Sequence, residues 1–154
     1  AWQHAAKYLQ SDEFGSDSPE IFISVPTTSP LRSPDDLDRI VEEYQRGGVD
    51  IVLGVKESDH NPYWNMFVLD EDGVASLAIE PSQENPHPTT RQSAPVTYDI
   101  TTVGYAVNLD YIIGASTLFE GTVRAVDIPI ERAWDIDTEM DLEIADFLLR
   151  RMNE

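Results

Sequence analysis

Short apolar runs alternate with amphipathic helical patterns along most of this chain. Residues 21–25 and 49–55 are continuous apolar runs of the kind that forms buried strands, and a helical pattern over 34–45 separates them. Ser33 and Pro34 supply the N-cap and first-turn residues of that helix, and Gly47-Gly48 ends it. This order predicts two parallel strands joined by a right-handed crossover.

Helical patterns also stand at both ends of the chain. Residues 2–9 place their apolar side chains on one helical face, and a polar loop is expected at 11–19. Because the sequence begins inside this pattern and without an initiator methionine, we expect a fragment of a longer protein. A last helix over 138–152 is expected to bury an apolar face made of Leu142, Ala145, Leu148, Leu149 and Met152.

The stretch from 57 to 95 interrupts the alternation. Two short strand patterns at 66–69 and 74–79 flank an Asp- and Gly-containing turn, which predicts a hairpin. Four prolines then fall between 81 and 95, so an irregular excursion is expected to follow the hairpin. Exposed-looking apolar side chains here, among them Trp64 and Phe67, predict that 57–95 is the dimerisation element of a homodimer.

Regular structure is expected to return after the excursion. The pattern predicts strands at 96–100, 103–107 and 123–128, with a short helix near 110–119. Together the elements predict one α/β domain over residues 1–154, in which helices cover both faces of a mostly parallel sheet and the hairpin excursion is inserted. A chain of 154 residues is long enough to bury one sizeable core.

Charge and composition exclude several classes of function. Ten basic residues against 29 acidic ones give a formal charge of −19, which would repel a phosphate backbone, so no nucleic-acid partner is expected. No apolar run is long enough to predict a membrane span. The absence of cysteine removes disulfides, thiolate catalysis and thiolate metal sites, and we expect a cytoplasmic protein.

Asp135 and Asp137 form the sharpest candidate site. If the segment is extended, both carboxylates lie on one face, where they can share a hard divalent cation such as Mg²⁺. Two close carboxylates also repel each other unless a cation neutralises them. The competing interpretation is that Asp137 is the N-cap of the last helix and that Asp135 faces water.

Two further groups of polar residues follow strand patterns. The loop at 26–32 leaves the first apolar run with three hydroxyls and Arg32, and it can hold a polar ligand or serve as a rigid connection. Around the return from the excursion stand Arg91, Asp99, Thr101 and Tyr105, where an arginine fork suits a carboxylate or forms a surface ion pair.

In combination, these segments resemble the acylneuraminate cytidylyltransferase family, which contains the CMP-sialic acid synthetases and their legionaminic- and pseudaminic-acid relatives. The resemblance is carried by Pro-Thr-Thr-Ser-Pro-Leu-Arg at 26–32, Asn-Pro-Tyr-Trp-Asn-Met at 61–66, Arg-Gln at 91–92 and Asp-Ile-Asp-Thr-Glu-Met-Asp-Leu at 135–142. Their order and spacing match over nearly the whole chain. The fold that this implies is a partial Rossmann-like, GT-A-like nucleotidyltransferase sheet, with residues 1–154 as the C-terminal portion of one cytidylyltransferase domain.

The resemblance also implies an activity: transfer of CMP from CTP to a nonulosonic, sialic-acid-like sugar with release of pyrophosphate. It implies that Asp135 and Asp137 hold Mg²⁺ and that they act in catalysis with Arg32. The residues that it implies for substrate binding are Thr28, Ser29, Arg91, Asp99, Thr101 and Tyr105, with Leu118 and Phe119 as an apolar wall.

Some positions depart from the family pattern. Trp64 stands where family members have a lysine, and Asp99-Ile100-Thr101 replaces an Arg-x-Asn element, so the identity of the sugar stays open. The stretch at 61–66 and Tyr98-Asp99 look more like the legionaminic-acid branch. The family's glycine- and lysine-containing loop, which grips the CTP phosphates, has no counterpart here, so we expect this chain alone to be inactive. Two other interpretations stay open: a non-catalytic remnant that binds sugar or dimerises, and part of a GT-A-like glycosyltransferase.

Overall fold

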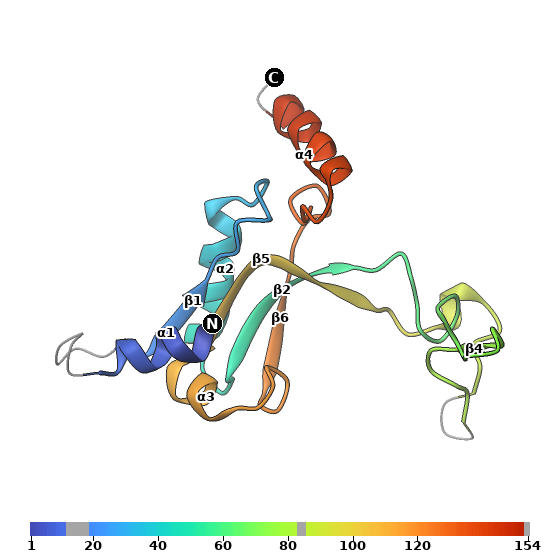
Figure 1. Ribbon diagram of the computed structural model, residues 1–154, viewed down its shortest axis with the longest axis horizontal. Coiled ribbons are helices and arrows are strands. Elements are labelled where there is room, and N and C mark those ends of the chain that lie inside the picture. Colours follow the sequence, from blue (N-terminus) through green and yellow to red (C-terminus); the bar gives the residue numbers. More distant parts are fainter. Residues whose placement is uncertain (12–18, 83–85, 153–154) are drawn as a thin grey trace. The chain divides into compact units, whose positions relative to one another are not determined.

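A computed structural model describes residues 1–11, 19–82 and 86–152 (Figure 1). The chain divides into two compact units, each described here by itself. The first unit contains Ala1–Lys56 and Ile100–Glu154, and the second contains Glu57–Asp99. Most of the loop expected at 11–19 lies outside the described residues.

The first unit is built around a four-stranded sheet. In the order β1-β5-β2-β6, its strands are β1 (Ile21–Ser24), β5 (Tyr98–Asn108), β2 (Ile51–Glu57) and β6 (Val123–Asp127) (Figure 1). β2 and β6 pair in parallel, and β1 pairs with β5 in antiparallel fashion. The Asn108 N–H donates to the Asp50 carbonyl at 2.8 Å, which brings the end of β5 beside the start of β2.

The prediction of a mostly parallel sheet is wrong, because β5 lies between β1 and β2 and runs antiparallel to both. One strand of 11 residues replaces the two short strands expected at 96–100 and 103–107. It runs antiparallel to both of its neighbours, so β1, β2 and β6 point the same way but β1 and β2 are not adjacent. The predicted α/β class is nevertheless confirmed. The carboxyl ends of three strands lie at one edge of the sheet, which is where ligands bind in open α/β sheets.

Helices cover both faces of this sheet. α2 (Pro34–Gln45) packs Ile40 against Val52 and Ala106, and α1 (Trp2–Leu9) with α3 (Leu109–Gly114) packs on Ile51 and Val107. Neighbouring residues of a strand point to opposite faces, so these two clusters lie on opposite sides of the sheet. None of the helices in the described ranges combines the length and the apolar character that crossing a bilayer requires.

Gly104 allows α2 to approach β5 closely. A Cβ added at this residue would lie 2.6 Å from Leu37 Cδ2 and 3.4 Å from Ile40 Cδ1. We expect Gly104→Val to lower the free energy of unfolding by about 2 kcal/mol, because overpacking forces side chains off their rotamers. Urea unfolding of the chain measures this loss. Gly114→Ala is the matched control, since no heavy atom lies within 4 Å of its added Cβ, and a loss as large as that of Gly104→Val would contradict the argument.

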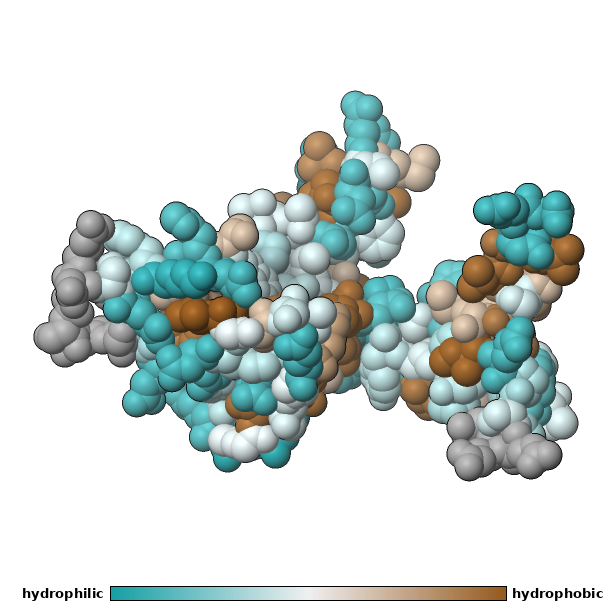
Figure 2. All heavy atoms as spheres, turned by 60° about the horizontal axis from the view of Figure 1, so that its bottom comes forward, coloured by the Kyte–Doolittle hydropathy of each residue, from teal (hydrophilic) through white to brown (hydrophobic). Residues whose placement is uncertain are grey.

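The last helix, α4 (Glu139–Met152), begins one residue later than predicted and does not have the predicted burial. Ala145 is buried, whereas Leu142, Leu149 and Met152 are 55%, 44% and 52% exposed, so the expected packing of these side chains is wrong for the described chain. Figure 2 shows apolar side chains on the surface of this helix.

The second unit contains the expected hairpin. β3 (Phe67–Leu69) and β4 (Ala75–Leu77) pair in antiparallel fashion around a turn in which Asp70 Oδ1 accepts from the Val74 N–H. A short 3₁₀ helix, η1 (Arg91–Ser93), follows in the irregular part. All three residues of β3 are exposed, and Figure 2 shows apolar side chains at the surface of this unit.

Candidate functional site

The loop that leaves β1 is held against Thr102 of β5. Ser29 Oγ lies 2.6 Å from Thr102 Oγ1 and is buried, and the Thr28 hydroxyl lies 3.4 Å from the same oxygen. The two prolines of the loop restrict its backbone further. The predicted site residues Thr28 and Ser29 therefore lie beside Thr102 of β5, at the carboxyl end of β1.

Arg32 folds back over this loop. Its Nε donates to the Ser29 carbonyl at 2.8 Å and its Nη2 donates to the Pro26 carbonyl. Burial lowers the pKa of the guanidinium below its usual value, because removal from water disfavours the charged form. Two of its nitrogens thus fix the shape of the loop, and the third, Nη1, is buried without a hydrogen-bond partner in the described chain.

Three side-chain atoms in the described residues are buried without a hydrogen-bond partner: Arg32 Nη1, Thr101 Oγ1 and Asp135 Oδ1. Buried polar atoms in proteins are nearly always paired, so each exception needs an explanation. All three belong to residues that the resemblance implies for the site. A cationic donor, a hydroxyl and a carboxylate oxygen that lack protein partners are groups that a phosphate, a sugar and a cation can satisfy.

Asp135 is carried by the segment between β6 and α4. The Ile136 N–H donates to the Thr28 carbonyl at 2.9 Å, which brings this segment to the loop after β1. Burial raises the pKa of Tyr105, and the negative charge of Asp135 raises it further. The structure therefore brings Thr28, Tyr105 and Asp135 into one region of the first unit.

Asp137 is not the cap of the last helix. Thr138 precedes the first residue of α4, and its hydroxyl accepts from the Asp141 N–H at 3.3 Å. Asp141 Oδ2 in turn accepts from the Thr138 N–H at 2.8 Å, which completes a reciprocal capping box. The capping interpretation of Asp137 is therefore wrong, and its exposed carboxylate makes no hydrogen bond or ion pair with the described residues.

Asp135 and Asp137 are the candidate ligands of a Mg²⁺ ion. In residues 1–11, 19–82 and 86–152, no three His, Cys, Asp or Glu side chains gather around one point that a metal could occupy. Two carboxylates, one with a buried unpaired oxygen, are nevertheless the oxygen ligands that Mg²⁺ takes when phosphate and water complete its shell. Asp135 and Asp137 thus offer oxygen ligands of the kind that Mg²⁺ takes, although they do not form a complete metal site by themselves.

Arg91 and Asp99 belong to the second unit. A cavity of about 410 Å³ in that unit is lined by Arg91 together with Asn61, Gln92 and Thr97. The Arg91 guanidinium makes one long contact, 3.4 Å, with the Asp59 carbonyl, and the Asn61 amide donates to the Pro95 carbonyl at 2.7 Å. Arg91 is exposed, so its guanidinium can reach an anionic ligand.

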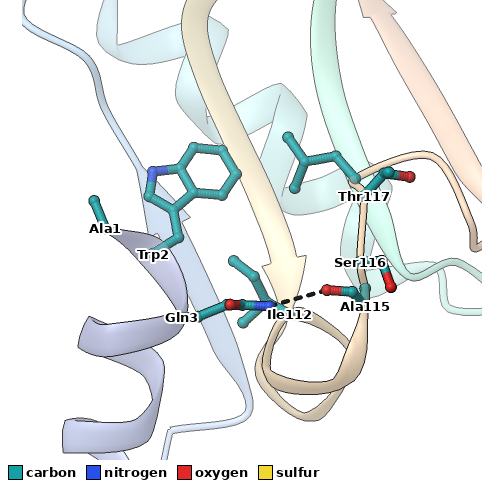
Figure 3. A pocket seen from close by; sticks show the side chains of 8 residues that line it. Ala1, Trp2, Gln3, Ile112, Ala115, Ser116 and Thr117 are labelled. Carbon is teal, nitrogen blue, oxygen red and sulfur yellow. Dashed lines mark hydrogen bonds between the residues drawn. The ribbon is translucent and has the colours of Figure 1, made fainter.

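Leu118 and Phe119 do not share one environment. Leu118 packs with Trp2 and lines a cavity of about 360 Å³ between α1 and the loop after α3, where the Gln3 amide donates to the Ala115 carbonyl at 2.9 Å (Figure 3). Phe119 is 60% exposed and does not line this cavity. Trp2 also packs edge-on against Tyr105, with ring centroids 5.1 Å apart.

Sequence reasoning missed a buried ion pair. Arg132 Nε and Nη2 lie 2.8 and 2.9 Å from the two oxygens of Asp36, whose side chain is fully buried. Burial alone would raise the pKa of Asp36, but the Arg132 guanidinium and the Ser33 N–H outweigh it and hold the pKa below its usual value. No local pattern signals this pair, because 96 residues separate Asp36 from Arg132.

Comparison with known proteins gives two sequence relatives, and no family model matches. Post-translational flagellin modification protein B of Campylobacter coli is 25% identical over 145 residues, which are 94% of this chain and 59% of that protein. CMP-N,N'-diacetyllegionaminic acid synthase of Campylobacter jejuni is 32% identical over 93 residues, 60% of this chain and 37% of that protein. The chain thus spans less than two thirds of either relative.

Solved structures share the fold at low identity. 4-Diphosphocytidyl-2C-methyl-D-erythritolsynthase from Anaerococcus prevotii matches with a TM-score of 0.60 and 12% identity, over 95% of this chain and 64% of that one. CMP:2-keto-3-deoxy-manno-octonic acid synthetase complexed with CTP matches with a TM-score of 0.57 and 13% identity, over 99% of this chain and 69% of that one. The predicted resemblance and the Rossmann-like nucleotidyltransferase fold are confirmed.

Proposed function

We propose that the complete protein containing this chain, a relative of a CMP-legionaminic acid synthase, transfers CMP from CTP to a nonulosonic acid and releases pyrophosphate. The observation that carries the proposal is the set of three buried, unpartnered atoms on Arg32, Thr101 and Asp135. They belong to a fold shared with a synthetase whose structure contains CTP. A nucleotide and a sugar acid supply the partners that these atoms lack.

Arg32 and the loop after β1 are assigned to the nucleotide. Arg32 Nη1 has no protein partner, and its guanidinium is held in place by two carbonyls of its own loop, so it meets a phosphate oxygen without losing further side-chain freedom. Ser29 and Thr28 fix the neighbouring backbone through Thr102. This preorganised cation stabilises negative charge that develops during the transfer.

Asp135 and Asp137 are assigned to a Mg²⁺ ion that accompanies the triphosphate. When bound, the ion neutralises phosphate charge and orients the pyrophosphate leaving group. The part of this chain is to present two carboxylate oxygens. Asp135 Oδ1 is buried and unpaired, and Asp137 is not occupied by helix capping.

The sugar acid is assigned to the remaining predicted residues. Arg91 suits its carboxylate, because a guanidinium binds carboxylates through two parallel hydrogen bonds. Asp99, Thr101 and Tyr105 offer polar atoms for its hydroxyl and acylamino groups. Leu118 supplies apolar surface in the cavity that it lines with Trp2, and Phe119, which is 60% exposed and does not line that cavity, is not assigned there. The stretch at 61–66 and Tyr98-Asp99, together with the relative that is a CMP-N,N'-diacetyllegionaminic acid synthase, support a legionaminic-type sugar.

In the proposed step the anomeric hydroxyl oxygen of the sugar attacks the α-phosphorus of CTP. A new phosphorus–oxygen bond to the sugar forms as the bond from the α-phosphorus to the bridging oxygen breaks. Pyrophosphate leaves with that electron pair, and the hydroxyl proton passes to solvent. The products are the CMP ester of the sugar acid and pyrophosphate, and we place the reaction in the cytoplasm because CTP is made there.

We also propose that the protein is a homodimer joined through residues 57–95. The β3 side chains Phe67, Val68 and Leu69 are 59%, 57% and 65% exposed, an apolar patch of the kind that marks an interface between proteins. Phe67→Glu should shift the protein from dimer to monomer in sedimentation. A wild-type protein that sediments as a monomer at high concentration would contradict this part of the proposal.

Pyrophosphate release tests the activity. The complete protein is incubated with Mg²⁺, CTP and either a legionaminic-type or a sialic-type acid, and the 154-residue chain is assayed beside it. The proposal predicts release only when CTP and a sugar acid are both present, and none from the chain alone. Turnover of a preformed nucleotide sugar instead would indicate a glycosyltransferase, and no turnover of either would leave the non-catalytic interpretation.

A further inference from the structure

The segment that carries Asp135 has no regular structure of its own. Residues 128–138, between β6 and α4, form neither strand nor helix. Their backbone is therefore not fixed by a ladder of hydrogen bonds, and tertiary contacts must determine where the Asp135 carboxylate lies.

One such contact is the ion pair between Arg132 and Asp36. The guanidinium binds both carboxylate oxygens, at 2.8 and 2.9 Å, in the two-bond geometry that best fixes orientation. Asp36 is fully buried, and its Oδ2 also accepts from the Ser33 N–H at 2.9 Å. The acceptor is thus rigid, because it is part of the first turn of α2.

Contacts on both sides of Asp135 complete the restraint. Before it, Ala133 is buried in the core cluster and the Trp134 indole donates to the Asp141 carbonyl at 3.1 Å. After it, the Ile136 N–H donates to the Thr28 carbonyl at 2.9 Å. Arg132 precedes Asp135 by three residues, a reach of about 10 Å at most.

The pair also means that Arg132 binds the carboxylate of Asp36 and not that of Asp135. The Nε–Nη2 edge of its guanidinium binds Asp36, and Asp135 Oδ1 has no partner in the described chain although this arginine is close in sequence. A buried ion pair adds little net stability over an apolar pair, so its geometry calls for another explanation.

We infer that Asp36 and Arg132 are a positioning pair, which ties the segment at 128–138 to the first turn of α2 and so holds Asp135 in place and unpaired. This assignment rests on the proposed role of Asp135 as a ligand of the nucleotide-bound cation. Neither residue touches substrate, and both act through Asp135.

Amide hydrogen exchange of the 154-residue chain tests the inference without any activity assay. In Asp36→Ala/Arg132→Ala, the Ile136 amide is expected to exchange at least about tenfold faster relative to the Val52 amide of β2 than in wild type, because the segment opens locally. Arg132→Lys, which keeps one charged hydrogen bond, should give a smaller change. Arg46→Met, which removes an exposed arginine paired with Glu43, is the matched control and should leave the ratio unchanged.

An unchanged ratio of the Ile136 to the Val52 exchange rate in the double variant would overturn the inference. This includes the case in which both amides exchange faster by the same factor, because that indicates global destabilisation. If the double variant does not fold, the same ratio in Arg132→Lys decides. In the complete protein the positioning role predicts that Arg132→Lys lowers kcat and weakens the apparent Mg²⁺ affinity with little change in KM for the sugar. If the wild-type protein releases no pyrophosphate, the proposed function fails while the exchange experiment still judges the positioning pair.

Discussion

Asp137→Asn in the complete protein is expected to lower the rate of pyrophosphate release from CTP by about 100-fold or more, since an amide is a poor substitute for a carboxylate ligand of a hard cation. The melting temperature should stay within about 2 °C of wild type, because Thr138 and not Asp137 caps α4. Asp135→Asn should lose activity to a similar extent. Its stability should not fall, because the change neutralises an unpaired buried oxygen.

Asp141→Asn is the matched control for this pair of substitutions. Asp141 lies on the same short stretch, but its carboxylate completes the capping box with Thr138, and the hydrogen bonds from Thr138 keep its pKa below the usual value. This variant should melt at a lower temperature and keep most of its activity. Equal rates in wild type and Asp137→Asn, at saturating CTP and sugar acid, would eliminate Asp137 as a metal ligand.

Arg132→Met should lower the free energy of unfolding of the chain by about 3 kcal/mol or more, a large part of the stability of a domain of this size. The reason is that Asp36, which is fully buried, keeps its charge but loses both guanidinium hydrogen bonds. Asp36→Leu/Arg132→Met removes both charges and should recover most of the loss. Urea unfolding at neutral pH compares the three proteins.

The pH dependence of this loss follows from the pKa of Asp36. In wild type the folded-state pKa lies below the usual value, so its contribution to stability is present above the unfolded pKa and is lost as pH falls through the folded one. Without Arg132, burial raises this pKa, and protonation then relieves the buried charge. The difference between wild type and Arg132→Met should therefore narrow from pH 7 toward pH 4, and a constant difference would contradict the account.

Local sequence patterns were sufficient to locate most helices and strands, but they did not predict which strands lie next to each other in the sheet. The apolar runs identified β1, β2 and β6 correctly, because runs rich in β-branched and other apolar residues favour strands. The burial expected of such runs holds for β2, whereas most residues of β1 are half-buried and most of β6 are exposed. β5 was predicted as two strands because Thr101 and Thr102 interrupt its apolar pattern. Thr102 fits a strand here because its hydroxyl lies 2.6 Å from Ser29 Oγ, and 73 residues of sequence separate the two.

In the candidate site, too, the sequence predicted the segments involved but not all of their contacts. The loop at 26–32 and the Asp135 segment were found because their residue types and spacing carry a resemblance, and the structure joins them through the Ile136–Thr28 hydrogen bond. The choice between Asp137 and Thr138 as helix cap was not decided by residue type, since both are good caps. The acid at Asp141, three residues after Thr138, was the available signal.

The central claim, attack by the sugar hydroxyl on the α-phosphorus of CTP, is tested most directly by isotope labelling. The complete protein is incubated with Mg²⁺, CTP and a legionaminic-type acid that carries ¹⁸O in its anomeric hydroxyl, and the product is followed by mass spectrometry and ³¹P NMR. The account predicts a CMP ester that retains the label in the bond between sugar and phosphorus, together with one pyrophosphate per ester. Loss of the label from the ester, or no ester from CTP while a preformed nucleotide sugar is consumed, would contradict it.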